Sequence, residues 1–188
     1  MFRENHRNEQ GNFFNTVGQL PYGVKKMMDK SWAPRFRELV FKRIDERRYA
    51  ELYSDIDSRP NFPVNIWVGL EVIKGIFDYT DEELIEQFHF NLLTAYALGL
   101  ENLGEVTLSE RTLYYNRKRL LEYEAQTGRN LLEEEFQAMA DNSLDELKRM
   151  VTDVEYFREV NGGDPGSDSL NYLFSYGSFV RTGKFIDP

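Results

Sequence analysis

Basic residues with phosphate-binding chemistry gather in two separate segments of this chain. Residues 35–48 and residues 111–119 each place several Lys and Arg side chains close together. Lys and Arg neutralise DNA phosphates, and Arg also reads guanine in the major groove, as Asn reads adenine. An amphipathic helix of any soluble protein also presents charges to water, so the pattern alone leaves both interpretations open. The candidate DNA-binding residues are Arg35, Lys42, Arg43, Arg47, Arg111, Tyr115, Arg117, Lys118 and Arg119.

The net charge of −9 argues against a nucleic-acid partner, so the distribution of charge matters more than the total. Residues 1–48 carry +5 and residues 110–130 carry +2, whereas residues 49–109 carry −9 and residues 131–188 carry −7. Phosphate binding depends on local clusters of cations and on the face that they share. The two basic segments therefore keep DNA among the expected partners.

Side chains suited to catalysis or metal binding are sparse. His6 and His89 lie far apart without metal-ligand spacing, and the chain has no cysteine. His89 stands between two phenylalanines, where a core or capping role is the simpler interpretation. The acidic residues at 81–86 suit the first turns of a helix, and those at 133–135 suit a solvated helix face. We predict no catalytic residue, no metal site and no cofactor for this chain.

Composition and hydropathy indicate a soluble protein. Hydrophobic residues make up 41% and charged residues 29%, as in ordinary globular domains. The longest apolar stretch, around residues 64–77, is interrupted by Asn65, Glu71 and Lys74, and is too short to cross a bilayer. The polar start shows no signal peptide, and the absence of cysteine fits a reducing compartment. We expect a cytoplasmic protein without a membrane partner.

Helical periodicity dominates the middle of the chain. As a helix, residues 63–78 place apolar side chains around most of the circumference. This pattern predicts a central helix buried in the core. Thr80 with Glu83, and Thr107 with Glu110, have the spacing of capping boxes at helix starts. Helical patterns extend over about residues 31–44, 63–78, 80–88, 92–100, 109–126, 130–140 and 143–151.

These signals predict an all-α fold, a bundle of five or six short helices over residues 31–151. Residues 1–30 contain glycine and proline with little periodicity, so we expect a flexible amino-terminal arm. Residues 152–188 change in character and become rich in Tyr, Phe and Ser after a glycine-rich run. We expect this divergent tail to be loop-like or a hairpin.

The order of short motifs between residues 50 and 140 resembles a known family. The motifs are Ser58-Arg59-Pro60 with Pro63, the apolar helix, Thr80 to Leu84, Ala97 to Leu100, and Thr112-Leu113 through Leu120. This order is similar to that of the amino-terminal domain of insertion-sequence transposases of the DDE superfamily. Ser58 replaces the usual Gly of that family, and Asn116 stands where Phe is common.

The resemblance implies a helical domain that recognises double-stranded DNA at terminal inverted repeats and helps to assemble the synapse. Catalysis in that family belongs to a later RNase-H-like domain, where three carboxylates hold two divalent metals such as Mg²⁺. The sequence motif of the strand that carries the first catalytic Asp in that family is not found after Val151. We therefore expect a truncated chain without that domain, and its status as an enzyme stays open.

The leading hypothesis is thus the DNA-binding part of an insertion-sequence transposase. An alternative is a protein-interaction module that pairs with itself or with intact, full-length transposase as an inhibitor. A free-standing metal-dependent nuclease is a third function, which the sparse catalytic chemistry disfavours.

Overall fold

A computed structural model describes residues 1–6, 15–54, 60–139, 145–146 and 149. Six α-helices and two 3-10 helices span the described residues up to Thr127, and residues 131–139 are also helical. No β-strand occurs in these ranges, which confirms the all-α class. The predicted tail, and most of the helix expected at residues 143–151, lie outside the described residues.

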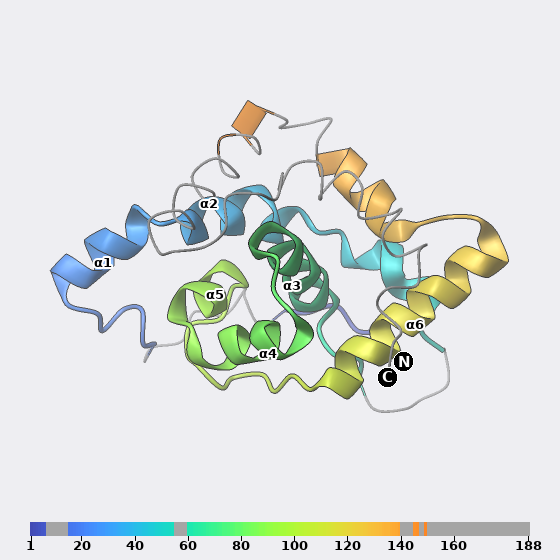
Figure 1. The fold of residues 1–188 in the computed structure, drawn as a ribbon, viewed down its shortest axis with the longest axis horizontal. Coiled ribbons are helices and arrows are strands. Elements are labelled where there is room, and N and C mark those ends of the chain that lie inside the picture. The colour runs from blue at the N-terminus through green and yellow to red at the C-terminus, as the bar shows by residue number, and fades with distance from the viewer. Residues whose placement is uncertain (7–14, 55–59, 140–144, 147–148, 150–188) are drawn as a thin grey trace.

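Helix α3 (Val64–Phe77) forms the centre of the domain, and the other helices surround it (Figure 1). All of its residues are buried, as the nearly continuous apolar pattern predicted. Gly69 allows close packing here, because a Cβ at this position lies only 2.6 Å from a methyl group of Leu98. The helix ends at Asp78, which adopts the left-handed conformation with φ of 55°.

The elements before α3 are shorter than the sequence indicated. Helix α2 (Trp32–Leu39) begins at its cap Ser31, and Trp32 packs against Phe77 with ring centroids 5.0 Å apart. The expected helix toward residue 44 ends early and continues as the 3-10 helices η2 (Phe41–Arg43) and η3 (Glu46–Leu52).

Three α-helices follow α3, in positions close to those predicted. They are α4 (Asp81–Phe90), α5 (Leu92–Ala97) and α6 (Glu110–Thr127). The capping box of α4 is confirmed, since Thr80 Oγ1 accepts from the Glu83 N–H at 3.2 Å and Glu83 accepts from the Thr80 N–H at 2.8 Å. The capping box expected at Thr107 is wrong. Ser109 caps α6 instead, by accepting from the Thr112 N–H at 3.3 Å.

The amino-terminal region contains structure where we expected a flexible arm. Helix α1 (Tyr22–Asp29) lies within it and projects at one edge of the domain (Figure 1). Residues 1–6 pack on the body of the domain. The ring of Phe2 lies 5.9 Å from that of Tyr53, and the Asn5 N–H donates to Glu46 Oε1 at 2.9 Å.

The helical residues 131–139 complete the described core, to which Leu131, Leu132 and Met139 contribute buried side chains. Across the described ranges, every helix is too short or too polar to cross a bilayer.

Candidate nucleic-acid interface

The outward face of α6 brings together most of the second basic segment. Arg111, Tyr115 and Lys118 are exposed at helical spacing, and Tyr114 beside them is also exposed. The guanidinium carbon of Arg111 lies 5.4 Å from the centroid of the Tyr115 ring, and the Tyr114 and Tyr115 rings lie 5.5 Å apart. We call this set, together with Arg119, the α6 basic face.

Aromatic and amide groups, rather than carboxylates, hold the two outer arginines. The guanidinium of Arg119 lies 5.0 Å from the centroid of the Tyr53 ring and donates to Asn116 Oδ1 at 3.3 Å. Among the described residues, neither Arg111 nor Arg119 has a carboxylate within ion-pair distance. Their positive charges are therefore not neutralised by the neighbouring protein.

The ring of Tyr53 stacks against the guanidinium of Arg119. The sequence did not predict that Tyr53 belongs to this site. Burial raises the pKa of Tyr53 to about 12, against the lowering effect of the Arg119 charge. The phenol therefore stays protonated at neutral pH, and its hydroxyl lies 3.5 Å from Asn116 Oδ1. Asn116 is itself buried, so its amide is not placed to read a base from the outer face.

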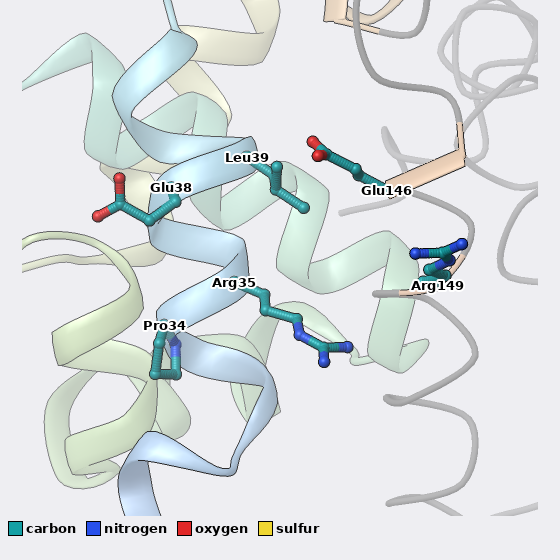
Figure 2. A pocket seen from close by; sticks show the side chains of 6 residues that line it. All are labelled: Pro34, Arg35, Glu38, Leu39, Glu146 and Arg149. Carbon is teal, nitrogen blue, oxygen red and sulfur yellow. The ribbon is translucent and has the colours of Figure 1, made fainter.

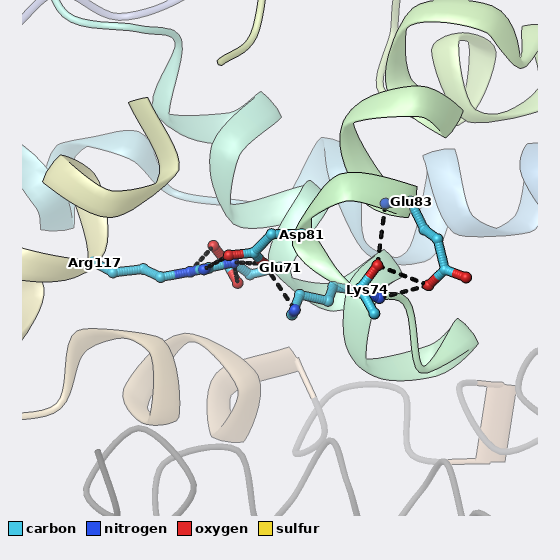
Figure 3. Close-up of polar contacts among 6 residues, drawn as sticks. Glu71, Lys74, Asp81, Glu83 and Arg117 are labelled. Atoms are coloured by element: carbon cyan, nitrogen blue, oxygen red, sulfur yellow. Dashed lines mark hydrogen bonds and ion pairs between the residues drawn. The ribbon is translucent and has the colours of Figure 1, made fainter. Parts of the chain in front are cut away.

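Arg117 does not belong to the outward face. It is therefore not placed to contact DNA, contrary to the prediction from the sequence. Its side chain is buried, with Nε 2.8 Å and Nη2 3.1 Å from the two carboxylate oxygens of Glu71 on α3. It also donates to both oxygens of Asp81 on α4, at 2.6 and 2.9 Å. Two carboxylates thus enclose one guanidinium in a fork-like arrangement (Figure 3).

Lys74 completes this buried charge cluster, which consists of Glu71, Lys74, Asp81 and Arg117. Its Nζ lies 2.7 Å from Asp81 Oδ1, so two cations balance two carboxylates. Burial by itself raises the pKa of Asp81, but hydrogen bonds and charge from Arg117 and Lys74 prevail and lower it to about 2. The cluster ties α3, α4 and α6 together and fixes which face of α6 turns outward.

The loop before α6 is held in place by a second polar contact. His89 Nε2, on α4, lies 3.0 Å from the Leu108 carbonyl oxygen, directly ahead of the Ser109 cap. This geometry fits a ring N–H that donates to the backbone. His89 therefore has a structural role, in line with the capping or core function expected of it.

In the first basic segment, three of the predicted DNA-binding cations are paired with acidic residues, as Lys118 on α6 is with Glu122 at 3.7 Å. The pairs are Lys42 with Glu38 at 2.6 Å, Arg43 with Glu146 at 3.8 Å, and Arg47 with Glu4 at 2.9 Å. Such exposed pairs add little stability, but each one places a carboxylate where a phosphate has to approach. Helices α2 and α6 also lie on either side of α3 (Figure 1), so the part of the first basic segment that lies on α2 does not join the α6 basic face.

Arg35 lines an open cavity of about 410 Å³ beside α2 (Figure 2). Its neighbours there include Leu39, Glu146 and Arg149, so the lining mixes both signs of charge with apolar carbon. A carboxylate-rich metal site is not formed, and no group of three potential metal ligands occurs within the described ranges.

These observations define an all-α domain with a buried central helix, a buried charge cluster and an outward basic face on α6. The chain belongs to the family described as Transposase domain (DUF772), whose model matches residues 25–119. The matched residues run from α1 into α6 and include the whole charge cluster and the α6 basic face. Comparisons with curated proteins and with solved structures gave no match.

Membership of this family confirms the resemblance to a transposase domain and indicates a transposase-related role. The assignment to the DDE superfamily and the recognition of DNA remain predictions.

Proposed function

We propose that this chain is a DNA-binding domain of an insertion-sequence transposase that recognises terminal inverted repeats through the α6 basic face. The observation that carries the proposal is the pair Arg111 and Arg119, which are exposed and lack a carboxylate partner among the described residues. Lys42 and Arg47 of the first basic segment are instead paired with Glu38 and Glu4. An unneutralised cation keeps its full attraction for phosphate.

The spacing of the α6 basic face suits a helix that enters the major groove. Arg111, Tyr115 and Lys118 follow one another by four and three residues, so their side chains lie along one line of the helix. In the proposed complex, Arg111 reads a guanine edge, while Lys118 contacts a phosphate. Tyr115 packs beside Arg111 and restricts its rotamers, which lowers the entropy lost on binding.

The buried charge cluster supports this function by presenting the helix. Glu71 and Asp81 hold the inner side of α6 through Arg117, so the orientation of the outer side is set before DNA arrives. The negative charge of Asp81 is matched internally by Arg117 and Lys74, which limits its repulsion of phosphate. An acidic protein is therefore compatible with local phosphate binding at this face.

Fluorescence anisotropy with labelled duplexes tests the proposal. The specific duplex carries the inverted repeats that flank the coding sequence, and the competitor has the same composition in shuffled order. We expect tighter binding to the specific duplex, with affinity that falls as salt rises. Arg111→Ala should weaken specific binding about tenfold to a hundredfold, and Lys118→Ala should reduce the salt slope by about one unit.

Lys42→Ala is the matched control, because it removes the same charge from a lysine paired with Glu38 on α2. It should leave both affinities nearly unchanged. Equal affinity for the specific and shuffled duplexes, or a loss in Lys42→Ala as large as in Arg111→Ala, contradicts recognition by the α6 basic face.

A further inference from the structure

Helix α1 leaves nearly all of its surface in contact with water. Of its eight residues only Met28 is buried, while Tyr22 is 82% and Met27 is 73% exposed. A helix of this length is marginal in water without tertiary packing. Large exposed apolar side chains on such an element are typical of an interaction surface.

The lysines of α1 are also unusual, because they lack ion-pair partners among the described residues. Lys25, Lys26 and the C-cap Lys30 are all exposed, and no described carboxylate lies within ion-pair distance of them. By contrast, Lys42 and Lys118 each pair with a glutamate within a helical turn. The exposed surface of α1 thus combines unpaired positive charge with apolar side chains.

Helix α4 presents the opposite combination on its outward side. Glu82, Glu86 and Phe90 are exposed at successive four-residue spacings, and Phe90 is 77% exposed. Neither Glu82 nor Glu86 has an ion-pair partner among the described residues. They differ in this from Asp81, which belongs to the charge cluster, and from Glu83, which closes the capping box.

The two stripes match when the helices run antiparallel. Tyr22, Lys26 and Lys30 have the same four-residue spacing as Glu82, Glu86 and Phe90. An antiparallel pairing places Tyr22 beside Phe90, and it sets the lysines at 26 and 30 opposite the glutamates at 86 and 82. A parallel pairing instead sets an aromatic ring against a charge at both ends. Antiparallel packing also brings helix ends of opposite partial charge together.

We propose that α1 of one molecule packs antiparallel on α4 of a second copy of this chain. The contact would cover the exposed rings of Tyr22 and Phe90 and neutralise the charges on both helices. If α1 of each molecule packs on α4 of the other, the contact forms twice, the buried area doubles and the assembly closes as a dimer. This inference goes beyond the proposed DNA recognition and does not depend on it, because it uses no residue of the α6 basic face.

A second copy explains more of the observations than DNA does at this surface. Phosphate attracts the α1 lysines but leaves the Tyr22 ring in water, and it gives no role to the acidic stripe of α4. Helix α1 also lies at the edge of the domain away from α6 (Figure 1), so it does not extend the α6 basic face.

Sedimentation equilibrium of the full chain over a range of concentrations tests the proposal. We expect reversible association that weakens as salt rises. The charge reversal Lys26→Glu with Lys30→Glu should raise the dissociation constant at least about tenfold. Glu86→Lys should act in the same direction from the other side of the contact, and it lies beyond the first turn of α4, where Glu82 supports the helix start.

A variant that combines charge reversals on both helices distinguishes this specific contact from a general effect of net charge on association. A chain that carries Lys26→Glu together with Glu86→Lys should associate more tightly than either single variant, because the charge pair is restored in reverse. Lys42→Glu on η2 is the matched control and should associate like the unmodified chain. Circular dichroism and thermal unfolding of each variant show that its fold is retained.

Three outcomes overturn the inference. They are a strict monomer at every concentration, association that is indifferent to Lys26→Glu and Glu86→Lys, and failure of the combined variant to recover. If the unmodified chain is monomeric and Lys26→Glu weakens duplex binding instead, α1 is a DNA-contacting helix and the self-association proposal is wrong.

Discussion

At the scale of single residues, Arg117 links three helices through its buried charge pairs. Its guanidinium is buried between Glu71 and Asp81, and Glu71 is completely buried. Arg117→Met removes the guanidinium that pairs with the buried Glu71 carboxylate, so we expect a loss of about 3–5 kcal/mol in the free energy of unfolding. Urea denaturation measures it.

The neighbouring Lys118 is the control for this prediction. Lys118→Met changes the same charge one residue further along α6, where the side chain is exposed and pairs weakly with Glu122 at 3.7 Å. The free energy of unfolding of Lys118→Met should differ from that of the unmodified chain by no more than about 0.5 kcal/mol. Equal losses in the two variants contradict a special role for the buried cluster.

Asp81 makes the stability of the domain depend on pH in the acid range. Its pKa falls from the ordinary value of 3.8 to about 2 in the folded chain. The unfolded chain therefore binds a proton more readily, so this contribution is complete above pH 3.8 and is lost as pH falls toward 2. Urea midpoints measured at descending pH should fall less steeply in Asp81→Asn than in the unmodified chain. If the urea midpoints of the two chains fall equally with pH, Asp81 does not cause the pH dependence.

The sequence contained a signal for the burial of Arg117 that its charge concealed. Arg117 lies four residues after Leu113 and three before Leu120, and both leucines are buried core residues. Periodicity thus places it on the inner face of α6. Glu71 and Lys74 within an otherwise apolar helix are the complementary signal, because buried charges need partners. Which charges pair depends on tertiary packing, and that was beyond prediction.

At the scale of elements, the start of α3 depends on a side chain from another element. Pro63 provides no side-chain cap, and Glu46 of η3 accepts instead from the N–H groups of Val64 at 3.2 Å and Asn65 at 3.3 Å. Burial raises the pKa of Glu46, against the lowering effect of these backbone donors and of Asn5. The carboxylate therefore acts as a long-range cap for the central helix.

Glu46→Ala should cost about 1–3 kcal/mol of stability, because it leaves buried backbone donors at the start of α3 without an acceptor. Hydrogen exchange resolved by residue should show faster exchange at Val64 and Asn65 than in the unmodified chain. Glu38→Ala, on the exposed side of α2, serves as the comparison. Unchanged exchange at the start of α3 rules out the capping role.

Elements with strong apolar periodicity were predicted well, and short or weakly buried ones were not. Helices α3, α4 and α6 occupy nearly the expected residues, because α3 is buried on all sides and α4 and α6 are each buried along one face. Helix α1 buries only Met28, so its sequence carries no core-facing pattern. The 3-10 helix η3 depends on contacts such as Glu46 with α3, which local sequence does not encode.

At the scale of the whole molecule, contacts between distant segments close the domain. The Asn5 N–H donates to Glu46 across 41 residues, and the Asp45 N–H donates to Glu135 Oε1 at 3.0 Å across 90 residues. These side-chain-to-backbone bonds link the first residues, η3 and the helical residues 131–139. The 3-10 region thus joins the two ends of the described chain, a role that its irregular sequence did not reveal.

Removal of residues 2–6 should therefore weaken the whole domain, although these residues lie outside the helices. The deletion uncovers Tyr53 beneath the lost ring of Phe2, and it removes the donors of Asn5 that bind Glu46 and Asn65 Oδ1, the latter at 3.0 Å. We expect a loss of about 2–4 kcal/mol in the free energy of unfolding. Thermal and urea unfolding of the full and shortened chains measure it.

Arg3→Ala provides the control for the deletion, because the Arg3 side chain is exposed and its contact with Asn61 runs through the backbone N–H at 2.7 Å. This variant should keep nearly all of the stability, whereas Phe2→Ala should lose part of it. A shortened chain as stable as the full one contradicts the closing role of these residues. Since Tyr53 also supports Arg119, the shortened chain should in addition bind duplex DNA less tightly if the α6 basic face is the binding surface.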